Sequence, residues 1–219
     1  MNAAMPGAQT QLFDDAPAPQ WEPVDSPEPE RAQVWLRRAF IPADEATTLF
    51  ERLREAIPWR HDDITMFGKT YAVPRLHQWY GDASYTWSGI EMQPLRFTPE
   101  LDAIRQRIEA ATRRRFNSAL INHYRDRADT VGWHADDEPE LGPAPFIASL
   151  SLGAERDFAL RRNEPDPEGQ RRRIDLTLPH GSLLVMTEGF QAAWQHSLPR
   201  RKRVHAGRIN LTFRAMHPA

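Results

Sequence analysis

The sequence predicts an α+β domain in which short strands form a sandwich or an open barrel and helices pack on its outside. Two kinds of apolar spacing indicate this. In the first half of the chain, apolar residues recur at helical spacing in two segments. From Asn117 onward they recur at every second position, which is typical of strands that bury one face. Many short strands after two helices pack most simply as facing layers with the helices outside.

The two helices are placed by their apolar stripes. The first is expected to run from Asp44, whose side chain can cap it, to about Ile57. The second is expected to follow Pro99 and to end near Phe116. The stripes, which we expect to face the core, are Ala46, Leu49, Phe50, Leu53 and Ile57 in the first helix and Leu101, Ile104, Ile108 and Ala111 in the second.

The strands are placed by alternation and by turn residues. Phe146, Ala148, Leu150 and Leu152 share one face of a predicted strand, as do Ile174, Leu176 and Leu178 of another. Gly153, residues 179–181 and Gly207 separate these runs as turns.

The composition limits the organisation and the setting of the chain. Its 219 residues suit one compact domain. Residues 1–30 are rich in Pro, Ala and acidic residues without apolar periodicity, so we expect a disordered tail there and a globular domain over 31–219. The absence of cysteine excludes disulfides and thiolate metal sites. Without a membrane-spanning apolar run or a signal-peptide pattern, the expectation is a cytoplasmic protein, with a monomer as the default.

The charge distribution restricts how the chain can bind nucleic acid. The net charge of −2 means that the protein as a whole is not a polycation. Binding must therefore come from local basic runs, namely Arg113–Arg115, Arg171–Arg173 and Arg200–Arg203. Each run is more often an ordinary solvated face, so both interpretations stay open.

Three residues have the types and spacing of a metal site. His134 and Asp136 lie two positions apart, so on an extended segment their side chains point the same way. His196 follows 62 positions after His134 and is free to lie on a neighbouring strand. Two imidazoles and one carboxylate can hold a ferrous ion on one face and leave three positions for a co-substrate and oxygen. His-x-Asp is common by chance, so this pair alone is a weak signal.

The last predicted strand adds groups that could bind an oxoacid. Its polar face carries Arg208, Asn210, Thr212 and Arg214. Two arginines with an amide and a hydroxyl between them form a line of donors suited to a dicarboxylate. Asn122 and Tyr124 could add two hydrogen-bonding groups. An ordinary strand with one wet and one buried face explains the same alternation. Together with the metal pattern, the arginines indicate an oxygenase of the iron and 2-oxoglutarate type.

Six segments in order carry a resemblance to a known family, from about Trp35 to Arg214. The chain resembles the AlkB family, most closely the branch of its homologues two and three. The segments are Asn122–Tyr124, His134–Glu138, Ile147–Phe158, His180–Leu184, His196–Pro199 and Arg208–Arg214.

The resemblance implies a double-stranded β-helix (jelly-roll) core with flanking N-terminal helices and a nucleotide-recognition lid. It implies that His134, Asp136 and His196 bind Fe(II), which 2-oxoglutarate chelates through its keto-acid end. Arg214 would hold the distal carboxylate of 2-oxoglutarate. The co-substrate pocket would be completed by Asn122, Tyr124, Arg208, Asn210 and Thr212.

The reaction that the resemblance implies is oxidative demethylation of bases such as 1-methyladenine and 3-methylcytosine in DNA. O2 and 2-oxoglutarate yield succinate and CO2, and the hydroxylated methyl group leaves as formaldehyde. The alternatives are the same chemistry on methylated RNA or protein, or a catalytically silent nucleic-acid-binding relative. The complete triad and both arginines argue against a silent relative.

The resemblance also implies how the base is reached, since a base inside a duplex must first be flipped out. Met66, Phe67, Gly68 and Lys69 resemble a hairpin that fills the gap left by the flipped base, with Phe67 as the wedge. Tyr85 and Trp87 resemble a lid whose aromatic rings stack on a cationic base. Asp137 and Glu138 would add negative charge near that base. Without the resemblance, these aromatic side chains are more simply explained as core residues.

One further segment lies in the predicted tail. Gln9–Phe13 resembles the short peptide by which bacterial replication and repair proteins bind the sliding clamp. A match of five residues arises easily by chance. The expected partners are therefore methylated DNA, with RNA as an alternative, and the sliding clamp. On DNA, a cytoplasmic protein of this kind would be associated with the nucleoid.

Overall fold

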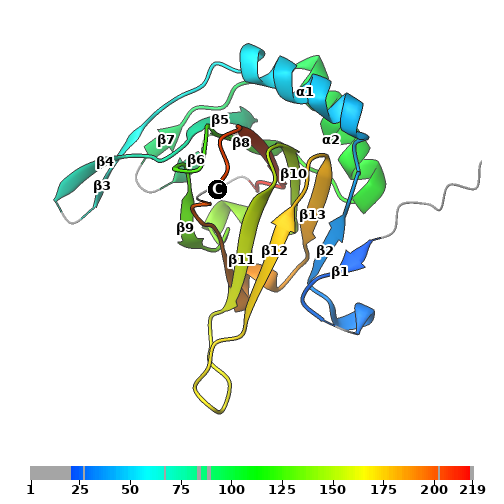
Figure 1. The fold of residues 1–219 in the computed structure, drawn as a ribbon, viewed down its shortest axis with the longest axis vertical. Helices are drawn as coiled ribbons and strands as arrows, with labels where there is room; N and C mark the ends of the chain where they lie inside the picture. Colours follow the sequence, from blue (N-terminus) through cyan, green and yellow to red (C-terminus); the bar gives the residue numbers. More distant parts are fainter. Residues whose placement is uncertain are drawn as a thin grey trace, which may run out of the picture.

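Two antiparallel sheets face each other and form a jelly-roll (Figure 1). The computed structural model describes residues 21–26, 28–66, 68–82, 85–87, 90–201 and 203–217. The larger sheet has seven strands in the order β1-β2-β13-β10-β15-β8-β5, and the smaller has four in the order β12-β11-β14-β9. This arrangement confirms the predicted fold class and its jelly-roll core.

The described part of the chain forms two sheets, two hairpins and three α-helices. The larger sheet contains β1 (Glu22–Pro23), β2 (Val34–Arg37), β5 (Leu76–Gly81), β8 (Ser118–Tyr124), β10 (Ile147–Gly153), β13 (Ser182–Met186) and β15 (Arg208–Arg214). The smaller sheet contains β9 (Val131–His134), β11 (Arg156–Arg162), β12 (Arg173–Leu178) and β14 (Trp194–Leu198). Two separate hairpins are formed by β3 (Asp63–Met66) with β4 (Lys69–Ala72) and by β6 (Tyr85–Trp87) with β7 (Ile90–Met92). The helices are α1 (Ala43–Ala56), α2 (Pro99–Thr112) and α3 (Phe190–Ala193), with 3-10 turns at Pro29–Arg31 and Pro139–Leu141.

The two longer helices pack on the outside of the larger sheet, as the apolar stripes predicted. Helix α2 is capped by Thr98, whose hydroxyl accepts a hydrogen bond from the Leu101 N–H at 3.2 Å. It ends at Thr112 rather than near Phe116, because Arg113 adopts a left-handed conformation with φ of 56°. Helix α1 begins at Ala43 and has no side-chain cap, so the predicted capping role of Asp44 is wrong. Asp44 instead lies in the first turn, where its negative charge interacts favourably with the positive end of the helix dipole.

Strand β15 is buried on both faces, which decides between the two interpretations of its alternation. All seven of its residues are buried. Ile209, Leu211 and Phe213 belong to the outer core, the apolar cluster between the helices and the larger sheet. Its polar residues face the space between the two sheets, where they line a pocket. The strand therefore has no wet face.

The globular part begins earlier than the predicted boundary at residue 31. Strand β1 pairs with β2, and Trp21 packs against the outer core. The buried Asp25 carboxylate accepts hydrogen bonds from the backbone N–H groups of Gln33 at 2.7 Å and Val34 at 3.0 Å. These backbone contacts leave no apolar pattern in the sequence. Gln9–Phe13 lies outside the described residues. Within them, no helix is long and apolar enough to cross a membrane.

Candidate metal and oxoacid site

The three predicted metal ligands meet at one point between the sheets. His134 ends β9 and lies opposite His196 of the neighbouring strand β14, and Asp136 follows in the loop after β9. The two imidazole centroids are 4.2 Å apart, and His134 Nε2 lies 3.9 Å from Asp136 Oδ1. One ligand atom from each of the three residues lies within 4.8 Å of the others. A single ion can therefore contact all three side chains.

The protonation states of these residues suit a divalent metal. His134 Nδ1 lies 2.9 Å from the Gly132 carbonyl, to which it donates, and this leaves the Nε2 lone pair free. Burial, together with the neighbouring His134, lowers the pKa of His196 to about 3, so its imidazole is neutral. Burial raises the pKa of Asp136, but the positive charge of Arg214 and the hydrogen bonds that Arg214 donates outweigh burial and hold that pKa below its usual value. Two imidazoles and one carboxylate are the donor set that ferrous iron takes in oxygenases.

Asp136 is held from two sides. Its carboxylate accepts hydrogen bonds from Arg214 at 2.7 Å and 3.3 Å, and both side chains are almost fully buried. Its backbone N–H donates to Gln191 Oε1 at 3.0 Å. Gln191 was not predicted from the sequence. The position of the carboxylate is therefore fixed before any metal binds.

Arg208 lies on the same face of β15 but in a different electrostatic setting. It is 2% exposed, and its terminal nitrogen donates to the Ser151 hydroxyl at 2.9 Å. Its guanidinium carbon lies 5.3 Å from the centroid of the Tyr124 ring. Among the described residues, no carboxylate lies within ion-pair distance of it. Burial lowers the pKa of Arg208 to about 10, although a hydrogen bond with Tyr124 opposes this shift.

This geometry distinguishes the two arginines. We expected Arg214 to hold the distal carboxylate of an oxoacid, but its guanidinium is already paired with Asp136 at the metal end of the pocket. Arg208 stands six residues away along β15 and still lacks an anionic partner among the described residues. The predicted role of Arg214 stays a prediction, and the two arginines differ in their charge partners. The sequence showed two equivalent arginines, because the loop that brings Asp136 to one of them is a tertiary feature.

The other predicted co-substrate residues line the same pocket. Asn122, Tyr124, Asn210 and Thr212 all face it. Asn210 donates to the Ser149 hydroxyl at 2.7 Å, and the Thr212 hydroxyl donates to Asn210 Oδ1 at 3.0 Å. The pocket is therefore preorganised by hydrogen bonds between its own walls.

Sequence reasoning missed two polar residues that line the pocket, Arg75 and Ser149, and one that contacts Arg208 behind it, Ser151. Ser149 and Ser151 alternate with the apolar face of β10, so the same period of two that identified that face could have placed them opposite β15. Arg75 precedes β5 and donates through Nε to Asn122 Oδ1 at 2.8 Å. No periodic or motif signal marked Arg75, because it reaches the pocket from an irregular segment.

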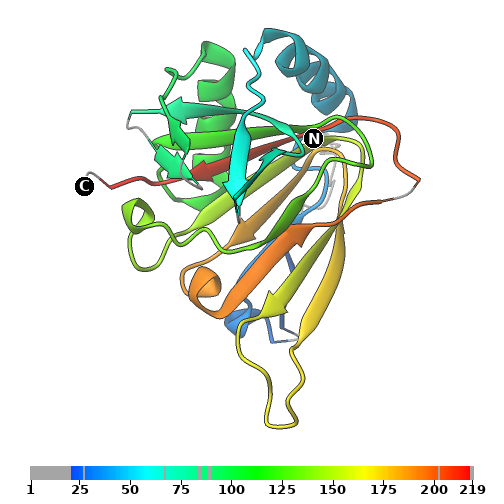
Figure 2. The ribbon, with the colours of Figure 1, turned by 90° about the vertical axis from the view of Figure 1, so that its left-hand side faces the viewer.

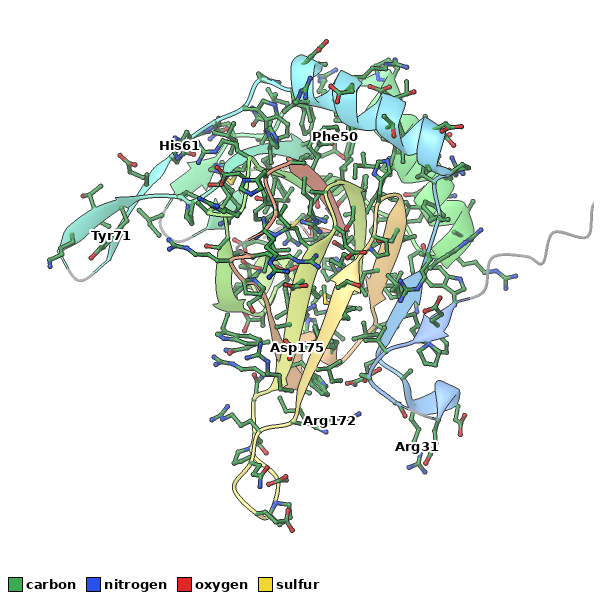
Figure 3. All side chains as sticks on the ribbon, viewed as in Figure 1. Arg31, Phe50, His61, Tyr71, Arg172 and Asp175 are labelled. Atoms are coloured by element: carbon green, nitrogen blue, oxygen red, sulfur yellow. The ribbon has the colours of Figure 1, made fainter. Side chains whose placement is uncertain are left out.

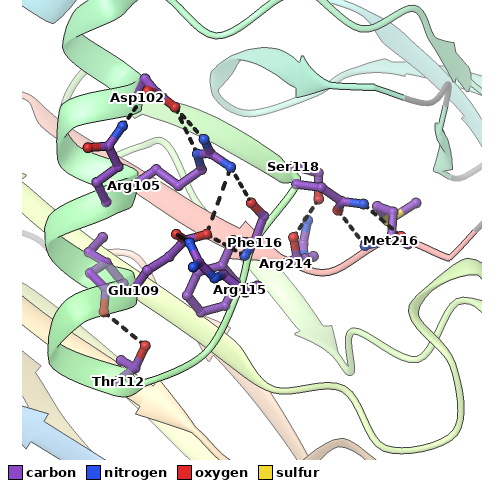
Figure 4. Close-up of polar contacts among 12 residues, drawn as sticks. Asp102, Arg105, Glu109, Thr112, Arg115, Phe116, Ser118, Arg214 and Met216 are labelled. Carbon is purple, nitrogen blue, oxygen red and sulfur yellow. Dashed lines mark hydrogen bonds and ion pairs between the residues drawn. The ribbon is translucent and has the colours of Figure 1, made fainter.

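The end of β15 that carries Arg214 is fixed by a network reaching to helix α2 (Figure 4). The Ser118 hydroxyl donates to the Arg214 carbonyl at 3.0 Å. The Asn117 side chain donates to the Met216 carbonyl and accepts from the Met216 N–H, at 2.8 Å and 2.7 Å. Glu109 of α2 accepts from the Phe116 N–H at 2.8 Å, one residue before Asn117. This network anchors the backbone from which Arg214 reaches the metal end.

The predicted nucleic-acid contacts lie on projecting segments. The β3–β4 hairpin extends from the body of the domain (Figure 1), with Tyr71 of β4 51% exposed (Figure 3). Gly68 in its turn has φ of +74°, which glycine adopts without strain, and Lys69 is exposed. Met66 ends β3, while Phe67 lies outside the described residues.

The lid and the acidic residues are described to different extents. Tyr85 and Trp87 stand two apart in β6, although only their backbone is described. Asp137 directly follows Asp136 and is exposed, and Glu138 is half-buried. Both acidic residues therefore lie next to the metal ligands along the chain.

Four arginines of the basic runs pair with acidic neighbours. Arg114 pairs with Glu188, Arg115 with Glu109 and Arg201 with Glu155. Arg173 pairs with Asp175 near the long β11–β12 connection (Figure 3), which projects away from the sheets in Figure 2. For these arginines the interpretation as solvated faces is favoured.

The comparisons with known proteins agree with this site. Residues 33–214 match the model of the 2OG-Fe(II) oxygenase superfamily. The chain is 42% identical over 192 residues to the rat (Rattus norvegicus) alpha-ketoglutarate-dependent dioxygenase alkB homolog 3, covering 85% of this chain and 65% of the relative. It is 42% identical over 178 residues to the human (Homo sapiens) DNA oxidative demethylase ALKBH2, covering 78% and 68%. The match thus spans about two thirds of the length of these relatives.

A solved structure supports the fold. The structure titled OsALKBH1 superimposes with a TM-score of 0.59 at 17% identity, covering 84% of this chain and 96% of that one. At this identity the likeness concerns the fold alone. The matched family model and the 42% identity to homologues 2 and 3 show that the chain belongs to the AlkB family of the 2OG-Fe(II) oxygenase superfamily.

Proposed function

We propose that this chain is an oxidative demethylase of N-methylated bases in DNA, acting on lesions such as 1-methyladenine and 3-methylcytosine. The observation that carries the proposal is one buried pocket that combines the His134, Asp136 and His196 cluster with an uncompensated arginine, Arg208. The superfamily uses Fe(II), 2-oxoglutarate and O2. Relatives named DNA oxidative demethylase support DNA as the substrate class.

One end of the pocket would bind the metal, and the other end would bind the distal carboxylate of 2-oxoglutarate. His134, Asp136 and His196 hold the iron, which when bound supplies oxygen activation coupled to the conversion of 2-oxoglutarate into succinate and CO2. Arg208 pairs with the distal carboxylate, which compensates its buried charge. Arg214 keeps the Asp136 carboxylate oriented toward the metal. The two ends together orient the co-substrate and keep it away from water.

The projecting segments would present the base. Phe67 of the Met66–Lys69 turn would fill the gap that the flipped base leaves, and the exposed Lys69 would contact a phosphate. Tyr85 and Trp87 of the lid stack on the base, whose methylation makes it cationic. Asp137 and Glu138 provide negative charge beside the metal ligands. This division separates base recognition from the iron chemistry.

The test is mass spectrometry of an oligonucleotide with one 1-methyladenine, incubated with the protein, Fe(II), 2-oxoglutarate and ascorbate. We expect the loss of one methyl mass, and no loss with Asp136→Ala, which removes a metal ligand. Succinate formation without any loss from DNA would keep the oxygenase and reject DNA bases of this type. Parallel RNA oligonucleotides and methylated peptides would then identify the substrate class.

A further inference from the structure

Gln191 lies between the two chain segments that supply the metal ligands. It belongs to the short helix α3, which leads directly into β14 and therefore to His196. Its side-chain oxygen accepts a hydrogen bond from the Asp136 N–H at 3.0 Å, so Gln191 also contacts the segment that carries Asp136. Gln191 is 2% exposed, so this hydrogen bond is shielded from water.

The orientation of the Gln191 amide is determined by its surroundings. The oxygen faces a backbone N–H, which can only donate, and the amide nitrogen donates to the Met186 sulfur at 3.6 Å. The preceding residue, Phe190, is fully buried, and its ring centroid lies 6.4 Å from that of His196. Helix α3 thus contacts the segments of both Asp136 and His196.

We propose that Gln191 is a positioning residue for the metal site, and that its hydrogen bond fixes the Asp136 segment against the segment carrying His196. The inference rests on the metal site of the proposed function. Asp136 follows β9 in an irregular loop, so the sheet ladder does not fix its backbone. Arg214 orients the carboxylate group, whereas Gln191 fixes the main chain from which the carboxylate extends. Outer contacts of this kind commonly change metal affinity by about 10–100-fold.

The test is titration of the metal-free protein with Mn(II), followed by electron paramagnetic resonance, with thermal unfolding of the metal-free protein recorded in parallel. Gln191→Leu has a similar volume and no acceptor, and we expect it to raise the Mn(II) dissociation constant about tenfold or more. Gln191→Glu retains an acceptor oxygen at the same reach and should bind no more weakly than the parent protein.

Asn163→Ala is the matched control. Asn163 donates to the Ala192 carbonyl at 2.9 Å, so it holds the same helix from its exposed side without touching Asp136. We expect this variant to keep the parent affinity for Mn(II). If Gln191→Leu does not fold, Gln191→Asn replaces it, because it remains polar but is one methylene too short to reach the Asp136 N–H.

The outcomes separate the inference from the proposed function. Weaker binding by the Leu or Asn variant, with recovery in the Glu variant, supports the positioning role. Equal Mn(II) affinity in the parent protein and a folded Leu or Asn variant overturns it. An equal loss of Mn(II) affinity in Asn163→Ala also overturns the inference, because the loss would then come from disturbing helix α3 as a whole. A parent protein that binds no Mn(II) refutes the metal site itself, and with it the proposed function.

Discussion

The two ends of the pocket carry the same residue type in opposite electrostatic states. Arg208 and Arg214 share one face of β15 and are 2% and 3% exposed. Arg214 is paired with the Asp136 carboxylate, whereas Arg208 contacts the Ser151 hydroxyl and Tyr124 and has no carboxylate partner among the described residues. Burial and residue type therefore do not tell which arginine binds a ligand. What distinguishes the two arginines is whether a carboxylate already compensates the charge of the guanidinium.

The largest effect is expected at the paired end. Replacing Arg214→Met removes one partner of a buried ion pair and leaves Asp136 buried without compensation. We expect the free energy of unfolding of the metal-free protein, measured by urea denaturation, to fall by about 3–5 kcal/mol. The double variant Arg214→Met with Asp136→Asn should recover most of that loss, since no buried charge remains. An equal loss in the single and double variants would show that packing, rather than charge, dominates at this end.

The unpaired end should respond in the opposite way. Arg208→Met removes a buried cation that has no carboxylate partner, so the metal-free protein should unfold at the same urea concentration as the parent or at a higher one. The half-saturating concentration of 2-oxoglutarate in succinate assays should rise by about 10–150-fold, from the loss of about 1.5–3 kcal/mol of charged hydrogen bonding. Destabilisation as large as that of Arg214→Met would contradict the difference between the two ends.

The contrast also shows what the sequence could and could not reveal. Period-two alternation identified the polar face of β15, and the His-x-Asp spacing with His196 identified the metal cluster that the structure brings together. These are local patterns, set by which way neighbouring side chains point along a strand. The pairing of Arg214 with Asp136 depends on an irregular loop returning to a strand 78 residues away, so no local pattern encodes it.

The distinction between local patterns and tertiary contacts also explains the smaller differences between the predicted and the observed structure. The start of α2 next to Pro99 was predicted, because a proline at the first helical position is a local signal. Strand β1 and the buried Asp25 were missed, since this segment is held by backbone pairing and by hydrogen bonds to the Asp25 carboxylate rather than by an apolar stripe. Gln191 and Arg75 were missed for a related reason. Each acts through one side chain that reaches a distant segment.

A third variant compares the pocket with the projecting hairpin. Phe67→Ala removes the predicted wedge and leaves both ends of the pocket intact. Because loss of a stacked aromatic group costs about 1–3 kcal/mol, we expect demethylation of a duplex to fall by about tenfold. Single-stranded substrate and the 2-oxoglutarate requirement should change little, since neither needs the gap filled. Equal losses on duplex and single strand would remove Phe67 from base flipping.

The smallest effect on 2-oxoglutarate binding is expected from removing a hydrogen bond between two residues of the pocket wall, Asn210 and Ser149. Ser149→Ala removes the acceptor at 2.7 Å from Asn210, but the same amide nitrogen keeps the Leu150 carbonyl at 3.1 Å. One neutral hydrogen bond contributes about 0.5–1.5 kcal/mol, so the half-saturating concentration of 2-oxoglutarate should rise by about 2–10-fold. Ser151→Ala, beside Arg208, is the matched comparison. When the distal carboxylate takes over the Arg208 donors, loss of the Ser151 hydroxyl should weaken binding less than loss of Ser149 does. A larger effect from Ser151 would mean that Arg208 depends on the hydroxyl for its orientation, and that the unpaired end is preorganised as firmly as the paired one.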